Sequence, residues 1–227
     1  YGIASRRKAE QMILERRVRV NGNTASLGDV ADDEEDIIEV DGVRLKKQPE
    51  RVVLMLNKPR GYVCTLSDEK GRKTVAELVR DCGTRVYPVG RLDYDSEGLL
   101  LFTNDGALAD RLMHPRREIS KVYEVTARGP LDGVAERLRR PLVLDGYRIR
   151  PPEVEQTAPG RFLITIHEGR NRQIRRMCAA AGLEVLRLRR IAEGPLQLGT
   201  LAPGAWRPLT EAELAALRQE TEGGDPV

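Results

Sequence analysis

The sequence contains few of the residues on which metal and disulfide sites depend. Only two histidines and three cysteines occur in 227 residues, and Cys64, Cys82 and Cys178 lie far apart. This spacing supports neither a disulfide framework nor a cysteine-based zinc site, and two histidines are too few for most histidine-based metal centres. We therefore expect reduced cysteines in the interior and chemistry that needs no metal ion.

Long apolar runs and nucleotide-binding motifs are missing as well. No run of about 18 apolar residues occurs, and no charged-then-apolar leader opens the chain. The sequence also lacks a phosphate-binding glycine-rich loop, a dinucleotide fingerprint, a Gly-x-Ser-x-Gly elbow and a His-Glu-x-x-His motif. We expect a cytoplasmic protein that has no membrane partner, binds no nucleotide cofactor and is not a serine hydrolase.

Basic residues, by contrast, are numerous and clustered. The net charge is only +3, from 38 basic and 35 acidic residues, but Glu184 is the only acid between residues 169 and 191. Such one-sided clustering is typical of a surface that faces phosphate groups. The first cluster contains Arg6, Arg7, Lys8, Arg16, Arg17 and Arg19, and the second contains Arg170, Arg172, Arg175, Arg176, Arg187, Arg189 and Arg190.

The chain divides into a small module and a larger domain. In residues 1–46 a helix capped by Ser5 precedes two short strands with Asn-Gly and Asp-Gly turns. This module is too small to bury much apolar area alone, and since the chain starts at Tyr1 we expect it to lack an opening helix. Residues 47–51 have the composition of a linker. We assign residues 52–218 to a catalytic domain and 219–227 to a disordered tail.

In the larger domain, predicted strands outnumber predicted helices and do not alternate strictly with them. An α+β fold is therefore favoured over a doubly wound sheet. A capping box at Thr210 and Glu213 predicts the start of a last helix. The patterns predict strands at 52–56, 86–89, 98–102, 121–126, 162–167 and 185–191, and helices at 74–79, 134–138, 174–181 and between 106 and 115.

A polar segment bounded by glycines, residues 90–98, lies between two of the apolar strands. Loops on rigid strands commonly carry functional groups, although composition alone favours a surface turn with solvated carboxylates. Asp93 and Asp95 could serve as the paired carboxylates of a glycosidase. Two residues so close on one loop can hardly flank a sugar from both sides, so we rank this reading last.

Several motifs in order along the chain resemble the pseudouridine synthases of the RsuA/RluB family. These are NKPRG (57–61), GRLD (90–93), LLLFTNDG (99–106), KVYEV (121–125) and EGRNRQIRRM (168–177). Residues SRRKAE (5–10) and RVRVNG (17–22) are similar to the RNA-binding domain first known from ribosomal protein S4. The resemblance implies a mixed, mainly antiparallel sheet with flanking helices and a central cleft. It also implies isomerisation of a uridine in RNA without a cofactor.

By this resemblance, Asp93 is the nucleophile, Tyr123 stacks on or supports the target base, and Arg175 pairs with Asp93. An aspartate is ionised at neutral pH and therefore suits nucleophilic attack, and a guanidinium beside it favours that charged form. Asp95, in contrast, is expected to be only a turn residue. Without the resemblance, Tyr123 would be assigned to the core.

A base inside a helix is unreachable, so the target uridine must flip out. Arg91 is proposed to occupy the vacated space or to hold the flipped phosphate, although an ordinary surface arginine is equally plausible for its position. The remaining predicted RNA contacts are basic residues assigned to phosphate because they are many and spread out. They are Arg6, Arg7, Lys8, Lys58, Arg170, Arg172, Arg176, Arg187 and Arg189.

The expected partner is ribosomal RNA, free or in a pre-ribosomal particle, bound by a monomer. Asn171 and Arg172 resemble the branch of the family that acts on large-subunit RNA, so 23S rRNA is favoured over 16S rRNA. A non-catalytic RNA-binding or ribosome-assembly protein is the alternative, because it would carry the same basic clusters. Pseudouridine formation that depends on Asp93 separates the two.

Overall fold

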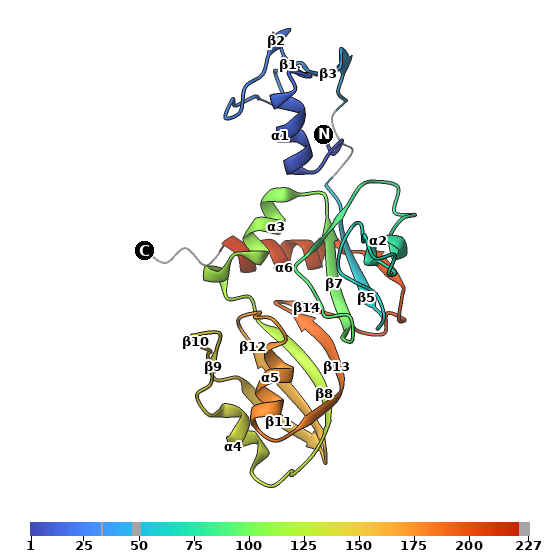
Figure 1. Ribbon diagram of the computed structural model, residues 1–227. Coiled ribbons are helices and arrows are strands. Elements are labelled where there is room, and N and C mark those ends of the chain that lie inside the picture. Colours follow the sequence, from blue (N-terminus) through green and yellow to red (C-terminus); the bar gives the residue numbers. More distant parts are fainter. Residues whose placement is uncertain (33, 47–50, 223–227) are drawn as a thin grey trace. The chain divides into compact units, whose positions relative to one another are not determined.

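The computed structural model describes residues 1–32, 34–46 and 51–222, in two compact units, Tyr1–Arg51 and Val52–Val227 (Figure 1). Residues 47–50 of the predicted linker and 223–227 of the predicted tail lie outside the described residues.

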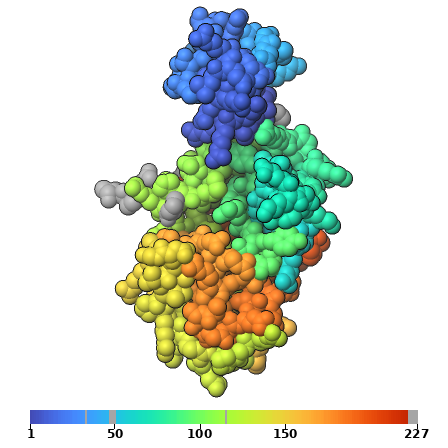
Figure 2. Space-filling model, in the orientation of Figure 1, coloured from blue at the N-terminus to red at the C-terminus, as the bar shows by residue number. Residues whose placement is uncertain are grey.

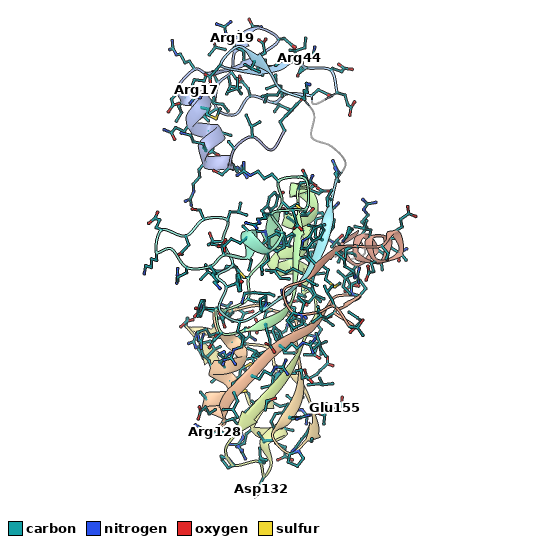
Figure 3. All side chains as sticks on the ribbon, turned by 90° about the vertical axis from the view of Figure 1, so that its right-hand side faces the viewer. Arg17, Arg19, Arg44, Arg128, Asp132 and Glu155 are labelled. Carbon is teal, nitrogen blue, oxygen red and sulfur yellow. The ribbon has the colours of Figure 1, made fainter. Side chains whose placement is uncertain are left out.

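The described part of the amino-terminal unit consists of one helix and a small antiparallel sheet with the strand order β2-β1-β3-β4. Helix α1 begins after Ser5, whose side chain accepts a hydrogen bond from the Lys8 backbone at 3.3 Å. Arg17 donates to Asp41 at 2.9 and 2.6 Å, and Figure 3 labels Arg17 with Arg19 and Arg44 in this unit. The elements are α1 (Arg6–Leu14), β1 (Val18–Val20), β2 (Asn23–Thr24), β3 (Ile38–Val40) and β4 (Val43–Arg44).

In the described part of the second unit, nine strands form one sheet. Its order is β11-β12-β8-β13-β7-β5-β15, with β14 beside β13 and β6 beside β7. Only the β13–β7 pairing is parallel, so the predicted α+β fold with a mixed, mainly antiparallel sheet is confirmed. The strands are β5 (Val53–Lys58), β6 (Tyr87–Val89), β7 (Glu97–Thr103), β8 (Lys121–Arg128), β11 (Glu153–Ala158), β12 (Arg161–Ile166), β13 (Glu184–Glu193), β14 (Leu196–Gln197) and β15 (Trp206–Pro208); a separate hairpin contains β9 (Val143–Leu144) and β10 (Tyr147–Arg148).

Two helices of the second unit, α3 and the last helix, begin at side chains that cap them. Asp105 accepts from the backbone of Ala107 and Leu108 at 3.1 Å at the start of α3, and Thr210 and Glu213 form the predicted capping box of the last helix. The helices are α2 (Val75–Leu78), α3 (Gly106–Met113), α4 (Val134–Arg139), α5 (Gln173–Ala180) and α6 (Glu211–Glu222), with a short 3-10 turn at Pro115–Arg117. No described helix is both long and apolar enough to cross a membrane.

The disordered tail was predicted to start at residue 219, but helix α6 includes this residue. It continues to Glu222, because Leu217 and Thr221 on its last turns are fully buried. Burial of these side chains holds the helix against the domain beyond the predicted boundary.

Alternating residues of β5 and β7 face two different cores, so this half of the sheet is covered on both faces. Leu54, Leu56, Leu100 and Phe102 belong to one core, which continues under α2, α4 and α5. The intervening residues belong to a second core that includes the inner faces of α3 and α6. Strand β11 was missed by the sequence patterns, because Val154 is the only buried residue in it.

Candidate active site

An open cleft of about 1290 Å³ lies in the second unit. Its lining includes Arg91, Asp93, Tyr123, Arg170 and Arg172 among the residues predicted for the site. A cleft of this volume exceeds the range of about 300–1,000 Å³ that is usual for small-molecule sites, so it has room for a nucleotide together with its neighbours. Asp93 is part of the 90–96 loop between β6 and β7, and its side chain is 27% exposed.

Lys58, at the end of β5, holds the loop that carries Asp93. Its side chain is fully buried, and Nζ donates to the carbonyl oxygens of Pro59 at 3.1 Å, Asp93 at 3.0 Å and Ser96 at 2.8 Å. Burial lowers the pKa of Lys58, and the nearby Cys64 and Asp93 act against this shift. The prediction that Lys58 contacts RNA phosphate is corrected, because its ammonium is enclosed by protein and used on backbone carbonyls.

The loop ends where β7 and β13 come closest together. Gly98 pairs with Arg190 in the parallel ladder and has φ of +108°. A Cβ at this position would lie 2.7 Å from the backbone nitrogen of Arg190, closer than real Cβ atoms approach. Glycine is therefore required here, and the close approach places Arg190 beside the 90–98 segment.

Asp95 is the acceptor for two arginines. Arg172 donates from Nη1 and Nη2 to its carboxylate oxygens at 3.0 and 3.1 Å, and Nη2 of Arg175 lies 2.9 Å from its backbone oxygen and 3.3 Å from Oδ2. Burial acts to raise the pKa of Asp95, but the hydrogen bond from Arg172 and the charges of both arginines outweigh it, so the pKa is lowered. Asp95 lies in a turn, as expected, but its side chain also binds these two arginines.

The arginine nearest to Asp93 differs from the predicted one. Nη1 of Arg172 lies 3.7 Å from Asp93 Oδ2, whereas Arg175 forms its ion pair with Asp95 and also donates to the backbone oxygen of Val185 at 3.3 Å. Burial lowers the pKa of Arg175, and Asp93 acts on it only as a more distant charge. The predicted pair of Arg175 with Asp93 is not among the ion pairs of the described residues, where Arg172 lies beside Asp93 instead.

Tyr123 is both a core residue and part of the cleft wall. It is 8% exposed, and burial raises the pKa of its hydroxyl, so the phenol is protonated at neutral pH. Beside it, the buried Arg190 donates from Nε to the Leu99 carbonyl at 2.7 Å, and its Nη2 lies 3.2 Å from Glu193 Oε2. Nζ of Lys121 is 4.0 Å from the same glutamate. The cleft floor thus contains a buried cation–carboxylate cluster.

The other predicted RNA-binding residues fall into two groups. Arg6, Arg7 and Lys8 are exposed on α1 in the first unit. In the second unit, Arg176 is paired with Asp145 at 2.7 and 3.0 Å, and Arg170 lies on the ring of Tyr147. Carboxylates also pair with Arg187 and Arg189, namely Glu97 and Glu124. Residues 169–191 are almost purely basic, but acidic side chains from other parts of the chain neutralise some of these arginines.

Sequence patterns did not identify Glu193, Lys121 or Tyr147 as site residues, although all three line the cleft. The one available signal was alternation: Lys121 and Tyr123 are two residues apart on the same face of β8. Among the described residues, no group of three histidine, cysteine or acidic side chains could hold a metal ion.

The comparison with known families assigns this geometry to a class of enzyme. Residues 52–180 match the RNA pseudouridylate synthase model, and residues 1–38 match the S4 domain. The chain therefore belongs to the RNA pseudouridylate synthase family, and it is an isomerase. This confirms the resemblance to the RsuA/RluB synthases that the motifs indicated.

Individual relatives support the assignment over nearly the whole chain. An uncharacterized RNA pseudouridine synthase of Aquifex aeolicus is 47% identical, covering 95% of this chain and 89% of the relative. Ribosomal large subunit pseudouridine synthase B of Bacillus subtilis is 41% identical, covering 98% of this chain and 94% of the relative. A crystal structure of a pseudouridylate synthase superposes with a TM-score of 0.70 at 32% identity and 94% coverage of both chains.

Proposed function

We propose that this synthase isomerises a uridine of large-subunit ribosomal RNA, in 23S rRNA, with Asp93 as the nucleophile on a flipped-out base. The observation that carries the proposal is the position of Asp93: its carboxylate opens into the cleft, its backbone oxygen is bound by the buried Lys58, and Arg172 lies 3.7 Å from its side chain. Such a carboxylate is held in place and charge-compensated, but solvent and substrate can reach it.

The reaction breaks the bond between N1 of uracil and C1′ of ribose and forms a bond between C5 and C1′. The proton on C5 is lost and N1 gains one, so the product is an isomer and no cofactor is consumed. The Asp93 carboxylate can add to the pyrimidine ring, attack C1′ or take the ribose 2′-proton. Each route begins with a carboxylate oxygen of Asp93 directed at the flipped nucleotide.

The cleft residues divide the remaining tasks. Tyr123 supplies an aromatic surface for the uracil ring, and its protonated hydroxyl, whose pKa burial raises, adds no charge next to Asp93. Arg91 is exposed at the cleft, where it can fill the gap that the flipped base leaves or bind its phosphate. Arg172 offsets the charge of Asp93 where water is excluded by bound RNA.

Ribosomal RNA as the substrate rests on two kinds of support. The Bacillus subtilis relative is named as acting on the large ribosomal subunit, and an S4 domain precedes the synthase domain. Asn171 and Arg172 agree with the large-subunit branch. Small-subunit 16S rRNA is the competing substrate, and the basic surfaces by themselves favour neither.

The test uses Asp93→Asn on transcripts of 23S and 16S rRNA. We expect wild-type protein to form pseudouridine in 23S rRNA, and Asp93→Asn to form none while it binds the RNA with unchanged Kd. Asp132→Asn is the matched control, because Asp132 is exposed and is not part of the cleft lining; Figure 3 labels it at the lower end of the ribbon. Near wild-type conversion by Asp93→Asn would refute the mechanism, and conversion of 16S rRNA alone would refute the substrate.

A further inference from the structure

The described residues include two exposed tyrosines, and both of them line the cleft. Aromatic residues make up 4% of the sequence. Among the described residues only Tyr94 and Tyr147 are exposed large aromatics, at 53% and 44%, and both line the cleft that contains Asp93. Tyr94 directly follows Asp93 in the chain. Tyr147 comes from the separate β9–β10 hairpin, and no step of the reaction requires it.

One face of Tyr147 is covered by a guanidinium. Cζ of Arg170 lies 3.4 Å from the centre of the ring, a stacked cation–π geometry. Nε of Arg170 is buried without a hydrogen-bond partner, and its nearest carboxylate oxygen, from Glu168, is 3.9 Å away. The ring of Tyr147 is therefore a closer partner of the Arg170 guanidinium than the Glu168 carboxylate, and the two planar groups form one stack.

The hairpin that carries Tyr147 is fixed to the domain on both sides. Asp145, in its turn, binds Arg176 of α5 through two hydrogen bonds of 2.7 and 3.0 Å. Leu144 pairs with Tyr147 across the hairpin and is buried in the core. After the hairpin, the Arg150 backbone donates to Glu168 at 3.0 Å. Figure 2 shows the hairpin in yellow directly beside the orange surface of the α5 region. The stack is thus preorganised.

We propose that Tyr147 and Arg170 form a stacking platform for an unpaired nucleotide next to the target uridine. The inference rests on the proposed function. Arg170 is two residues before Arg172, the arginine beside Asp93. The Cα atoms of the two arginines are at most about 7 Å apart, so the platform lies within reach of a nucleotide next to the target uridine. Unpaired bases bind RNA-binding proteins by stacking on aromatic rings and guanidinium planes, and the charge of Arg170 suits the adjoining phosphate.

The alternative role for this stack is to stabilise the hairpin alone. A structural role predicts that loss of the ring weakens binding to every RNA equally. A platform predicts that the effect disappears when the stacked base is removed from the RNA. The two roles are therefore separable by changing the protein and the RNA together.

The experiment uses a short ribosomal RNA hairpin that the wild-type protein converts, and versions in which each nucleotide flanking the uridine is made abasic in turn. Kd is measured in the Asp93→Asn background to prevent turnover. Tyr147→Leu should weaken binding of the intact hairpin by about 5- to 150-fold, the effect of one lost base–aromatic stack. Tyr147→Phe keeps the ring and should bind like the parent. Val143→Ala, exposed on the same hairpin but not in the cleft lining, is the control.

The decisive result concerns one abasic RNA. At the position of the stacked nucleotide, base removal should weaken binding to the parent protein, and Tyr147→Leu should cause no further loss on that RNA. Equal losses on all RNAs, or no loss on the intact hairpin, would overturn the platform while leaving the synthase activity in place. If wild-type protein converts no ribosomal RNA, the proposed function fails instead, and the inference fails with it. Thermal melting of Tyr147→Leu checks that the domain stays folded.

Discussion

The guanidinium of Arg172 is bound by Asp95 through two hydrogen bonds of 3.0 and 3.1 Å, while its Nη1 also lies 3.7 Å from Asp93. The Asp95 carboxylate also lies 3.3 Å from Nη2 of Arg175. Two like charges would repel each other without a shared anion between them. The Asp95 carboxylate therefore fixes the position of Arg172, the cation that faces the proposed nucleophile Asp93.

Asp95→Ala should lower kcat by roughly 10- to 100-fold and change KM little. The change removes hydrogen bonds between charged groups, worth about 1.5–3 kcal/mol, and each 1.36 kcal/mol corresponds to about tenfold in rate. Asp95→Asn keeps one acceptor oxygen for Arg172 and should fall between Ala and wild type. Steady-state kinetics on the converted RNA measures all three.

The control for Asp95 is Glu184→Ala. Glu184 is exposed and pairs with Arg128 through one carboxylate oxygen, and it lies outside the cleft lining. Its removal should leave kcat unchanged. A wild-type kcat in Asp95→Ala would mean that Arg172 keeps its position beside Asp93 without the Asp95 carboxylate. Asp95 would then be only a turn residue.

Lys58→Met should destabilise the protein by about 1–3 kcal/mol, because three buried or partly buried carbonyl oxygens lose their donor. The loop that carries Asp93 would also lose its main anchor, so kcat should fall more than the affinity for RNA. Urea unfolding and single-turnover rates test the two effects. Lys73→Met, at an exposed position of the same unit, should change neither. Unchanged stability in Lys58→Met would show that the ammonium is not needed to satisfy these carbonyls.

Sequence patterns were informative where the signal is local. The apolar runs of β5 and β7 predicted buried strands, and the glycine-bounded polar segment between β6 and β7 predicted the loop of Asp93. The pairings across the cleft were not predictable, since Asp95 meets Arg175 80 residues later in the chain. Lys58 resembles a surface lysine in sequence, because the carbonyls that bury its ammonium come from a loop 35 residues away.

Gly98→Ala should cost about 2–5 kcal/mol of stability. An alanine at φ of +108° is strained, and its Cβ would lie 2.7 Å from the Arg190 backbone nitrogen; positive φ costs about 1–2 kcal/mol and overpacking about 1–3 kcal/mol. Gly199→Ala separates the two terms, because φ there is +59° and nothing lies within 4 Å. The loss of stability in Gly199→Ala should therefore come from the positive φ alone. Equal unfolding midpoints in urea for the two variants would contradict the close β7–β13 approach.

The stability that Glu213 contributes should depend on pH. A hydrogen bond from the Arg207 side chain lowers the pKa of Glu213 from 4.5 to about 2. Because the folded-state pKa is the lower one, the stabilisation is complete above about pH 4.5 and is lost as the pH falls towards 2. Solvent screening reduces its size, so Glu213→Gln should cost about 1 kcal/mol at neutral pH.

Chemical unfolding of wild type and Glu213→Gln at several pH values provides the test. The difference in unfolding free energy should be constant between about pH 5 and 8 and should shrink below pH 4.5, because the wild-type carboxylate is then protonated and resembles the amide. Glu220→Gln, at an exposed position on the same helix, should match wild type throughout. A difference that grows as the pH falls would have the wrong sign for a carboxylate with a lowered pKa and would rule out the Arg207 pair as its source.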